Sequence, residues 1–182
     1  STGFLGTPNI LQALSDNGYT DVAYTLLLQE KNPSWLFSVN QGATTMWEHW
    51  NSLKEDGSFW SDDMNSFNHY AYGAVYDWIF STTLGIAPVE SAPAYREVTI
   101  APHPCRGLGF AKASIESRAG KITSYWYYTG NTVHYEFEIP EGVTEIADEA
   151  FWFSKSLESV KLPSTLTKLG KRVFAYCPAL TA

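Results

Sequence analysis

A carboxylate set among aromatic side chains is the most informative feature of this sequence. Glu48 lies in the stretch 41–50, between Trp47 and His49. A glutamate is rarely placed in an aromatic setting unless it is paired or functional. His69 follows 21 residues later, where a helix is expected to begin. The free N–H groups of a helix N-terminus would polarise the surroundings of that imidazole. We therefore interpret Glu48 and His69 as a candidate pair for catalysis or binding.

Neighbouring acidic and aromatic residues have less specific interpretations. Four carboxylates follow Glu48, and we expect them to form a solvated face and assign none of them as a general acid: Glu55, Asp56, Asp62 and Asp63. The chain also contains 7 Trp and 11 Tyr. These rings can pack a core, or they can stack on the apolar face of a pyranose ring.

Residues 1–87 have the apolar spacing of helices. In the first helix, Ile10, Leu11 and Leu14 share one face, and Gly18 suits the position just after a helix end. Thr20 is expected to cap a second helix that forms a hairpin with the first. Its predicted buried stripe consists of Val22, Ala23, Leu26 and Leu27.

A third helix is predicted over residues 68–84, with Asn65 or Ser66 as its cap and Gly85 after its end. Its predicted buried residues recur with a period near 3.6: Ala71, Ala74, Val75, Trp78 and Ile79. Residues 31–67 form a long polar and aromatic connection between the second and third helices. A connection of this length is usually functional or partly structured.

The pattern changes to strands after Pro88. Alternation of apolar and polar residues predicts four strands, over residues 97–100, 111–117, 122–128 and 133–139. Turn signals around Gly120 and Gly130 separate the last three strands. Antiparallel strands joined by tight turns favour a small β-sandwich, although four strands are few to close one.

The last segment repeats itself with a shift of 23 residues. Apolar positions recur in five pairs: Ile139 with Leu162, Val143 with Leu166, Ile146 with Leu169, Phe151 with Phe174 and Leu157 with Leu180. A period in the twenties with such an apolar ladder is typical of leucine-rich repeats, and this tail resembles those of bacterial surface antigens. Cys177 is expected to be a small core residue rather than a reactive thiol.

The helical and early strand segments resemble the C-terminal part of the bacterial α-L-rhamnosidases. The resemblance covers residues 2–140 and is carried by motifs in a fitting order: Thr2–Pro8, Pro33–Leu36, Gly42–Glu48, Met64–Val75, Ala101–Pro104 and Ala111–Ser114. It implies that residues 1–87 are the last helices of an (α/α)6 toroid and that residues 88–138 belong to a C-terminal antiparallel β-sandwich. With two leucine-rich repeats over residues 139–182, the expected fold is a mixed α and β multidomain fragment.

The family hydrolyses terminal α-L-rhamnosides with inversion at the anomeric carbon. By resemblance, Glu48 is the general base that activates a water, and a pocket with hydrogen-bond donors is expected to keep it ionised. His69 matches a histidine that contacts rhamnose hydroxyls, and Trp47 and Trp35 are expected to shape or stack on the sugar. The family's general acid lies on earlier helices. We therefore expect this chain to be a fragment that is inactive alone.

Composition restricts the partners. The net charge of −7 and the absence of a Lys/Arg cluster argue against nucleic acid and anionic membranes. No stretch approaches the roughly 20 apolar residues of a membrane span. Cys105 and Cys177 have no metal or redox spacing. We expect no cofactor and no metal, a rhamnose-containing glycan or glycoside as partner, and an extracellular, cell-surface or periplasmic parent protein.

Two other functions stay open. The repeats could bind a partner in an adhesion protein whose enzyme segment is degenerate, because such repeats bind through surfaces built by many units. A related toroid phosphorylase would use phosphate in place of water and would not need a dedicated base. The presence of Glu48 counts against the phosphorylase.

Overall fold

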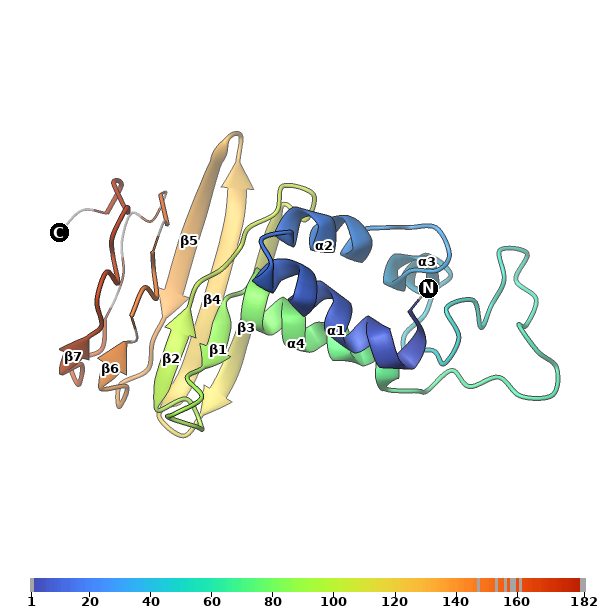
Figure 1. The fold of residues 1–182 in the computed structure, drawn as a ribbon, viewed down its shortest axis with the longest axis horizontal. Coiled ribbons are helices and arrows are strands. Elements are labelled where there is room, and N and C mark those ends of the chain that lie inside the picture. The colour runs from blue at the N-terminus through green and yellow to red at the C-terminus, as the bar shows by residue number, and fades with distance from the viewer. Residues whose placement is uncertain are drawn as a thin grey trace. The chain divides into compact units, whose positions relative to one another are not determined.

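The computed structural model describes residues 2–146, 148–152, 154–155, 157, 160 and 162–180 (Figure 1). The chain divides into two units, residues 1–78 and residues 79–182. The first is helical and the second is built from β-sheets. In the part of the chain that the structure describes, no helix is both long and apolar enough to cross a membrane.

Two helices open the first unit, α1 (Gly3–Asp16) and α2 (Thr20–Leu27). The predicted position of Gly18 after the end of α1 is confirmed, because Gly18 has a φ of +82°. Its N–H donates to the Ser15 carbonyl at 3.0 Å, and the N–H of Tyr19 donates to the Leu14 carbonyl at 2.8 Å. This pair of bonds is a Schellman motif, which satisfies the last carbonyls of α1.

The start of α2 differs from the prediction. Thr20 was expected to cap the helix but is its first residue, and Tyr19 occupies the cap position. The Schellman motif explains this, because it uses Tyr19 and leaves no further residue before α2 begins. Val22, which was expected to be buried, is 46% exposed. The residues that α2 buries are Ala23, Tyr24 and Leu27.

The long connection contains a short helix that the sequence pattern did not predict, α3 (Trp35–Asn40). The hydroxyl of Ser34 caps it by accepting the N–H of Phe37 at 3.0 Å. No helix lies between Gln41 and Tyr70, where turns and bends predominate.

The predicted third helix begins three residues late and changes its winding twice. It consists of η1 (Ala71–Ala74, 3₁₀), α4 (Val75–Trp78) and η2 (Ile79–Thr83, π). Neither Asn65 nor Ser66 caps it, because Tyr70 occupies the cap position and makes no side-chain cap bond. Trp78 is buried, and its Nε1 donates to the Ser15 hydroxyl at 2.9 Å, which ties α4 to α1.

The described residues of the second unit form two sheets. The three-stranded antiparallel sheet has the order β3 (Phe110–Ser117), β4 (Gly120–Thr129), β5 (Thr132–Glu138). The four-stranded sheet has the order β1 (Ile86–Pro88), β2 (Glu97–Ile100), β6 (Glu145–Ile146), β7 (Lys168–Leu169). The predicted strands therefore form as β2 to β5, whereas β1 was not predicted.

The core of the second unit is anchored on β4. Trp126 and Ser124 are fully buried. The indole N–H of Trp126 donates to the Thr83 carbonyl, and the Ser124 hydroxyl donates to the Leu84 carbonyl, both at 2.7 Å. Gly85 follows with a φ of +69°. A side chain there would overlap the backbone of Ala101 and Pro102, so this position requires glycine.

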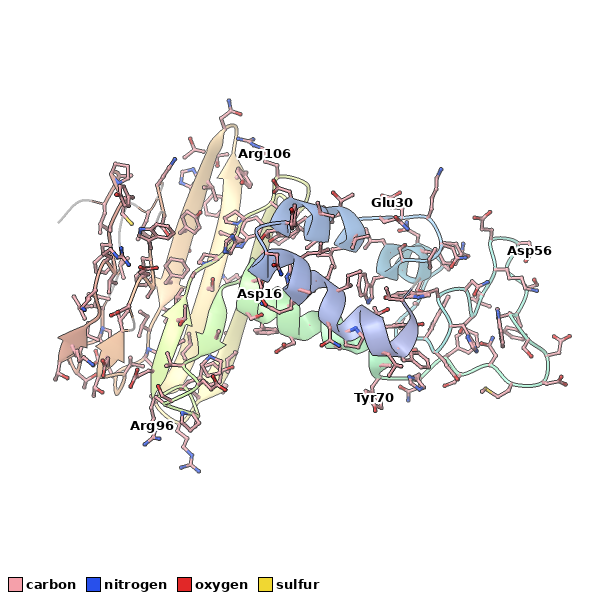
Figure 2. All side chains as sticks on the ribbon, viewed as in Figure 1. Asp16, Glu30, Asp56, Tyr70, Arg96 and Arg106 are labelled. Carbon is pink, nitrogen blue, oxygen red and sulfur yellow. The ribbon has the colours of Figure 1, made fainter. Side chains whose placement is uncertain are left out.

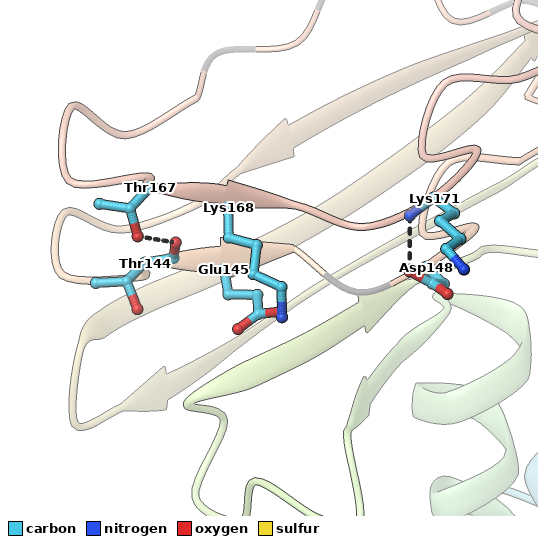
Figure 3. Close-up of polar contacts among 6 residues, drawn as sticks. All are labelled: Thr144, Glu145, Asp148, Thr167, Lys168 and Lys171. Carbon is cyan, nitrogen blue, oxygen red and sulfur yellow. Dashed lines mark hydrogen bonds and ion pairs between the residues drawn. The ribbon is translucent and has the colours of Figure 1, made fainter.

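The repeat stacks on itself with its sequence period. β6 and β7 pair in parallel, with Glu145 opposite Lys168 and Ile146 opposite Leu169, a shift of 23 residues. β6 also pairs in parallel with β2, so the repeat supplies two strands to the sheet that begins with β1 and β2. Figure 3 shows side chains of the two repeats meeting at the same spacing. The few predicted strands are thereby supplemented from the repeat.

Cys177 occupies the place expected for a small core residue. It packs against the buried apolar cluster, and its thiol donates to the Phe151 carbonyl at 3.0 Å. Burial raises the pKa of the Cys177 thiol, so the thiolate is disfavoured. The prediction of an unreactive thiol agrees with these contacts.

Candidate active site

Two backbone hydrogen bonds hold the Glu48 segment beside the His69 segment. The N–H of Glu48 donates to the Ser66 carbonyl at 3.0 Å, and the N–H of His69 donates to the Met46 carbonyl at 2.8 Å. The hydroxyl of Thr45 adds a third link by donating to the Phe67 carbonyl. The structure therefore brings Glu48 and His69 onto neighbouring segments within the first unit.

The imidazole of His69 has a fixed orientation. It stacks on the ring of Phe4 from α1, with centroids 4.7 Å apart and an interplanar angle of 6°. Its Nδ1 accepts the N–H of Ala71 at 3.3 Å, at the first residue of η1. Because Nδ1 accepts, the neutral ring carries its proton on Nε2. Nε2 is then the ring atom that can donate to a bound hydroxyl.

Glu48 is partly buried. Among the residues that the structure describes, none donates a hydrogen bond to its carboxylate or pairs with it as an ion. The expected hydrogen-bonding pocket is therefore not built from the described part of this chain. Both carboxylate oxygens keep their capacity to accept a proton from water.

A series of ring contacts connects His69 to Trp35. Phe4, which stacks on His69, also contacts Tyr72 at 5.0 Å. Tyr72 stacks on Trp50 at 3.8 Å, and Trp50 meets the edge of Trp35 at 5.2 Å. The indole N–H of Trp35 donates to the Tyr72 carbonyl at 2.9 Å. These contacts fix the relative positions of α1, α3 and η1.

Trp35 and Trp47 have different surroundings. Trp35 lines a cavity of about 270 Å³ together with Trp50 and Ser34, and neither Glu48 nor His69 contributes to its wall. Trp47 is only 4% exposed, and its ring packs edge-on against Phe67 at 5.3 Å. Within the described residues, Trp47 supports the backbone that carries Glu48 and offers no open ring face.

Two buried polar atoms near Glu48 lack a hydrogen-bond partner among the described residues, His49 Nε2 and Asn65 Oδ1. The His49 ring stacks on Trp60 with centroids 3.7 Å apart. Asn65 donates through its amide to the Ser52 carbonyl at 2.8 Å. Because these two atoms have no hydrogen-bond partner among the described residues, each can form a hydrogen bond with a water or a hydroxyl.

The four acidic residues that follow Glu48 are all exposed, as predicted: Glu55, Asp56, Asp62 and Asp63. Figure 2 shows Asp56 on the loop beyond α3. Hydrogen bonds from the Ser58 hydroxyl and backbone N–H lower the pKa of the Asp56 carboxyl. A carboxyl held in its ionised form in solvent is a poor proton donor, so Asp56 is unsuited to the role of general acid.

Sequence reasoning missed the residues that orient His69. Phe4 and Tyr72 lie within the motifs Thr2–Pro8 and Met64–Val75, and Trp50 is the last residue of the stretch 41–50, but local pattern assigns no orienting role to any of them. The contacts of Phe4 with His69 and Tyr72 join positions more than 60 residues apart in the chain. The one local signal was the high aromatic content of residues 35–72.

Comparison with known proteins gives the class. Residues 1–83 match the family model of the bacterial alpha-L-rhamnosidase 6 hairpin glycosidase domain, and residues 85–146 match that of the bacterial alpha-L-rhamnosidase C-terminal domain. The helical unit and the sheets that follow it thus resemble consecutive domains of the six-hairpin glycosidase class. By these matches residues 1–83 and 85–146 correspond to parts of those two domains of the bacterial α-L-rhamnosidases.

Individual relatives agree with the family models. An alpha-L-rhamnosidase of Streptomyces avermitilis is 48% identical over 126 residues, and one of Formosa agariphila is 42% identical over 143 residues. The matches cover 69% and 79% of this chain but only 12% and 15% of those proteins.

Two solved structures are also similar. The S. avermitilis alpha-L-rhamnosidase complexed with L-rhamnose has a TM-score of 0.69 at 44% identity, and the match covers 76% of this chain and 13% of that one. The native enzyme of Aspergillus terreus has a TM-score of 0.71 at 34% identity, with 77% and 16% covered.

Proposed function

We propose that this chain is part of a glycoside hydrolase that releases terminal α-L-rhamnose with inversion, and that Glu48 is its general base. The observation that carries the proposal is the hydrogen-bonded pairing of the Glu48 segment with the His69 segment. It puts the backbone of Glu48, whose side chain is partly buried, beside the segment that carries the oriented imidazole of His69. The names of the relatives support rhamnose as the sugar.

The chemistry asked of Glu48 is the transfer of one proton. In an inverting glycosidase, a carboxylate takes a proton from water while the water oxygen bonds to the anomeric carbon. A second carboxyl group, about 6.5–9.5 Å away, protonates the glycosidic oxygen as its bond to the sugar breaks. The Glu48 oxygens have no partner among the described residues, which suits them to hold and deprotonate a water.

His69 is proposed to bind the sugar rather than to move protons. Its Nδ1 is engaged by the Ala71 N–H, so Nε2–H can donate to a rhamnose hydroxyl. The stack on Phe4 keeps the ring in one orientation. Trp47 and Trp35 are proposed to shape the surroundings of the sugar, Trp47 from its buried position behind Glu48 and Trp35 through the ring series.

We further propose that the general acid lies outside these residues and that the chain alone does not complete the reaction. Each acidic residue just after Glu48 is exposed. The curated relatives are about seven to eight times longer than the stretch they share with this chain. The proposed organisation is a toroid segment over residues 1–87, a sandwich segment over 88–138 and two leucine-rich repeats over 139–182.

A second candidate function, partner binding through the repeats, is favoured by one observation. Contacts between the two repeats recur at a spacing of 23 residues, including Glu145 with Lys168 and Glu149 with Arg172. Regular stacking of this kind builds an extended surface.

The experiment on the first proposal is the Glu48→Gln variant of the protein that joins these residues to a complete six-hairpin domain. The amide that this substitution introduces cannot deprotonate water, so turnover of an aryl α-L-rhamnoside should fall by at least about 10²-fold. Glu55→Gln, an exposed site in the same loop, should retain normal turnover. Turnover of Glu48→Gln within a few-fold of the wild type would remove Glu48 from the mechanism.

A further inference from the structure

The outermost strand of the two stacked repeats is β7. Among the described residues, β7 pairs only with β6. The N–H groups of Lys168 and Gly170 point to the first repeat, where they donate to the Thr144 and Ile146 carbonyls at 3.0 and 2.8 Å. Alternate residues of a strand direct their backbone groups to opposite sides. The N–H and carbonyl of Leu169 therefore point to the open edge.

The two repeats carry opposite charge. Residues 139–161 contain five carboxylates and two lysines, a net charge of −3. Residues 162–182 contain three basic residues and no acidic one, a net charge of +3. In the stack, Glu145 pairs with Lys168, and Asp148 accepts the backbone N–H of Lys171 (Figure 3). Glu149 pairs with Arg172. The interface between the repeats thus combines strand pairing with charge complementarity in one register.

An apolar ladder crosses the same interface. Phe137 of β5 contacts Phe151 at 5.2 Å, and Phe151 stacks on Phe174 at 5.2 Å with an angle of 9°. An open groove of about 560 Å³ is lined by Phe174, the last ring of this ladder, and by Lys155, Tyr176, Cys177 and Pro178. The groove can take the apolar side chain of a further unit.

We infer that this edge binds a polypeptide segment of the same 23-residue pattern whose side chains are acidic, added in parallel to β7. The inference rests on the proposed partner-binding role of the repeats. The segment would place carboxylates on the free side of Lys168, Lys171 and Arg172 and an apolar residue in the groove. A second copy of this chain does not fit, because it would bring its own basic β7, and its acidic β6 is already paired on both sides.

The test uses the full chain and a labelled synthetic peptide with the sequence of residues 139–160. Fluorescence anisotropy should give a Kd of roughly 1–100 µM, since a segment that orders on binding loses much of its gross affinity. A peptide with Glu141, Glu145, Asp148 and Glu149 replaced by lysine should bind at least about tenfold more weakly, because three basic residues face it. Equal binding of the two peptides would overturn the inference.

Two variants of the protein distinguish strand pairing at the edge of β7 from nonspecific attraction between charges. Leu169→Pro removes the outward N–H without touching the bonds to β6, and it should abolish binding, whereas Leu169→Ala keeps the N–H and should bind. Lys171→Glu leaves the edge intact and should weaken binding of the acidic peptide. A peptide in which lysine replaces Asp148 should restore binding to the Lys171→Glu variant.

Unchanged binding by Leu169→Pro would overturn the inference. Self-association of the chain would also overturn the inference, if sedimentation detects it for the wild type and not for Leu169→Pro. In that case a second copy of the chain would occupy the edge. None of these measurements involves hydrolysis, so a failure here is distinguishable from a failure of the glycosidase proposal.

Discussion

Phe4 lies parallel to the imidazole of His69, with 4.7 Å between the ring centroids and 6° between the ring planes. Phe4 is the second residue of α1, and His69 lies two residues before η1. The orientation of His69, in the loop before η1, therefore depends on the packing of α1.

Phe4→Leu should weaken sugar binding while leaving the chemical step largely intact. Leucine keeps the apolar volume but loses the ring stack, which is worth about 0.5–1.5 kcal/mol. If His69 binds substrate and transition state equally, KM should rise roughly 2- to 12-fold with kcat nearly unchanged. Steady-state kinetics of the complete enzyme measures this. Leu5→Ala, at a 91% exposed neighbour, should change neither constant, and a selective fall in kcat for Phe4→Leu would contradict the binding role.

Gly85→Ala should be among the most destabilising substitutions in the chain. A side chain there overlaps the backbone of Ala101 and Pro102, so the strand pairing at β1 must shift, at a cost of at least about 3 kcal/mol. Gly130 has a similar φ of +56° with nothing near its missing side chain, so Gly130→Ala should cost only about 1–2 kcal/mol. Thermal melting of the two variants compares their losses of stability. Equal losses would show that the close approach of Gly85 to the backbone of Ala101 and Pro102 does not determine the cost.

Tyr135 should titrate well above the ordinary pKa of a tyrosine. Burial raises its pKa to about 12, and ionisation of Tyr128 and Cys177 adds to the shift. Between pH 10 and 12 the unfolded chain releases this proton while the folded chain retains it, so the free energy of unfolding falls as pH rises through that window. Ultraviolet absorbance titration measures the late phenol. Tyr135→Phe should remove it and flatten the alkaline loss of stability, and an unchanged titration would contradict the assignment.

Local pattern predicted much of the fold, but not the details of the site. The strands β3 to β5 were predictable because apolar and polar residues alternate along much of their length and because glycines mark both turns. The 23-residue register of the repeats was predictable because the same apolar positions recur in the sequence. Residues 68–70 were predicted as the start of a helix, but the N–H of His69 instead donates to the Met46 carbonyl. Such long-range pairing leaves no trace in local periodicity.

The candidate site was located by residue type, and its supporting contacts were not. Glu48 and His69 stood out as a carboxylate and an imidazole in an aromatic setting. The stack of Phe4 on His69 depends on how α1 packs, which no nearby residue indicates. The short helix α3 was missed because six residues are too few for a helical period to be recognised, although Ser34 was a usable cap signal.

The most direct measurement of the role of Glu48 is chemical rescue of Glu48→Ala in the complete enzyme. Azide, a nucleophile that needs no base, should enter the space left by the carboxylate and attack the anomeric carbon on the face that water uses. The account predicts very low turnover without azide, a large increase with it, and β-L-rhamnosyl azide as the product identified by NMR. Formation of the α-configured azide, or normal hydrolysis by Glu48→Ala without azide, would contradict it.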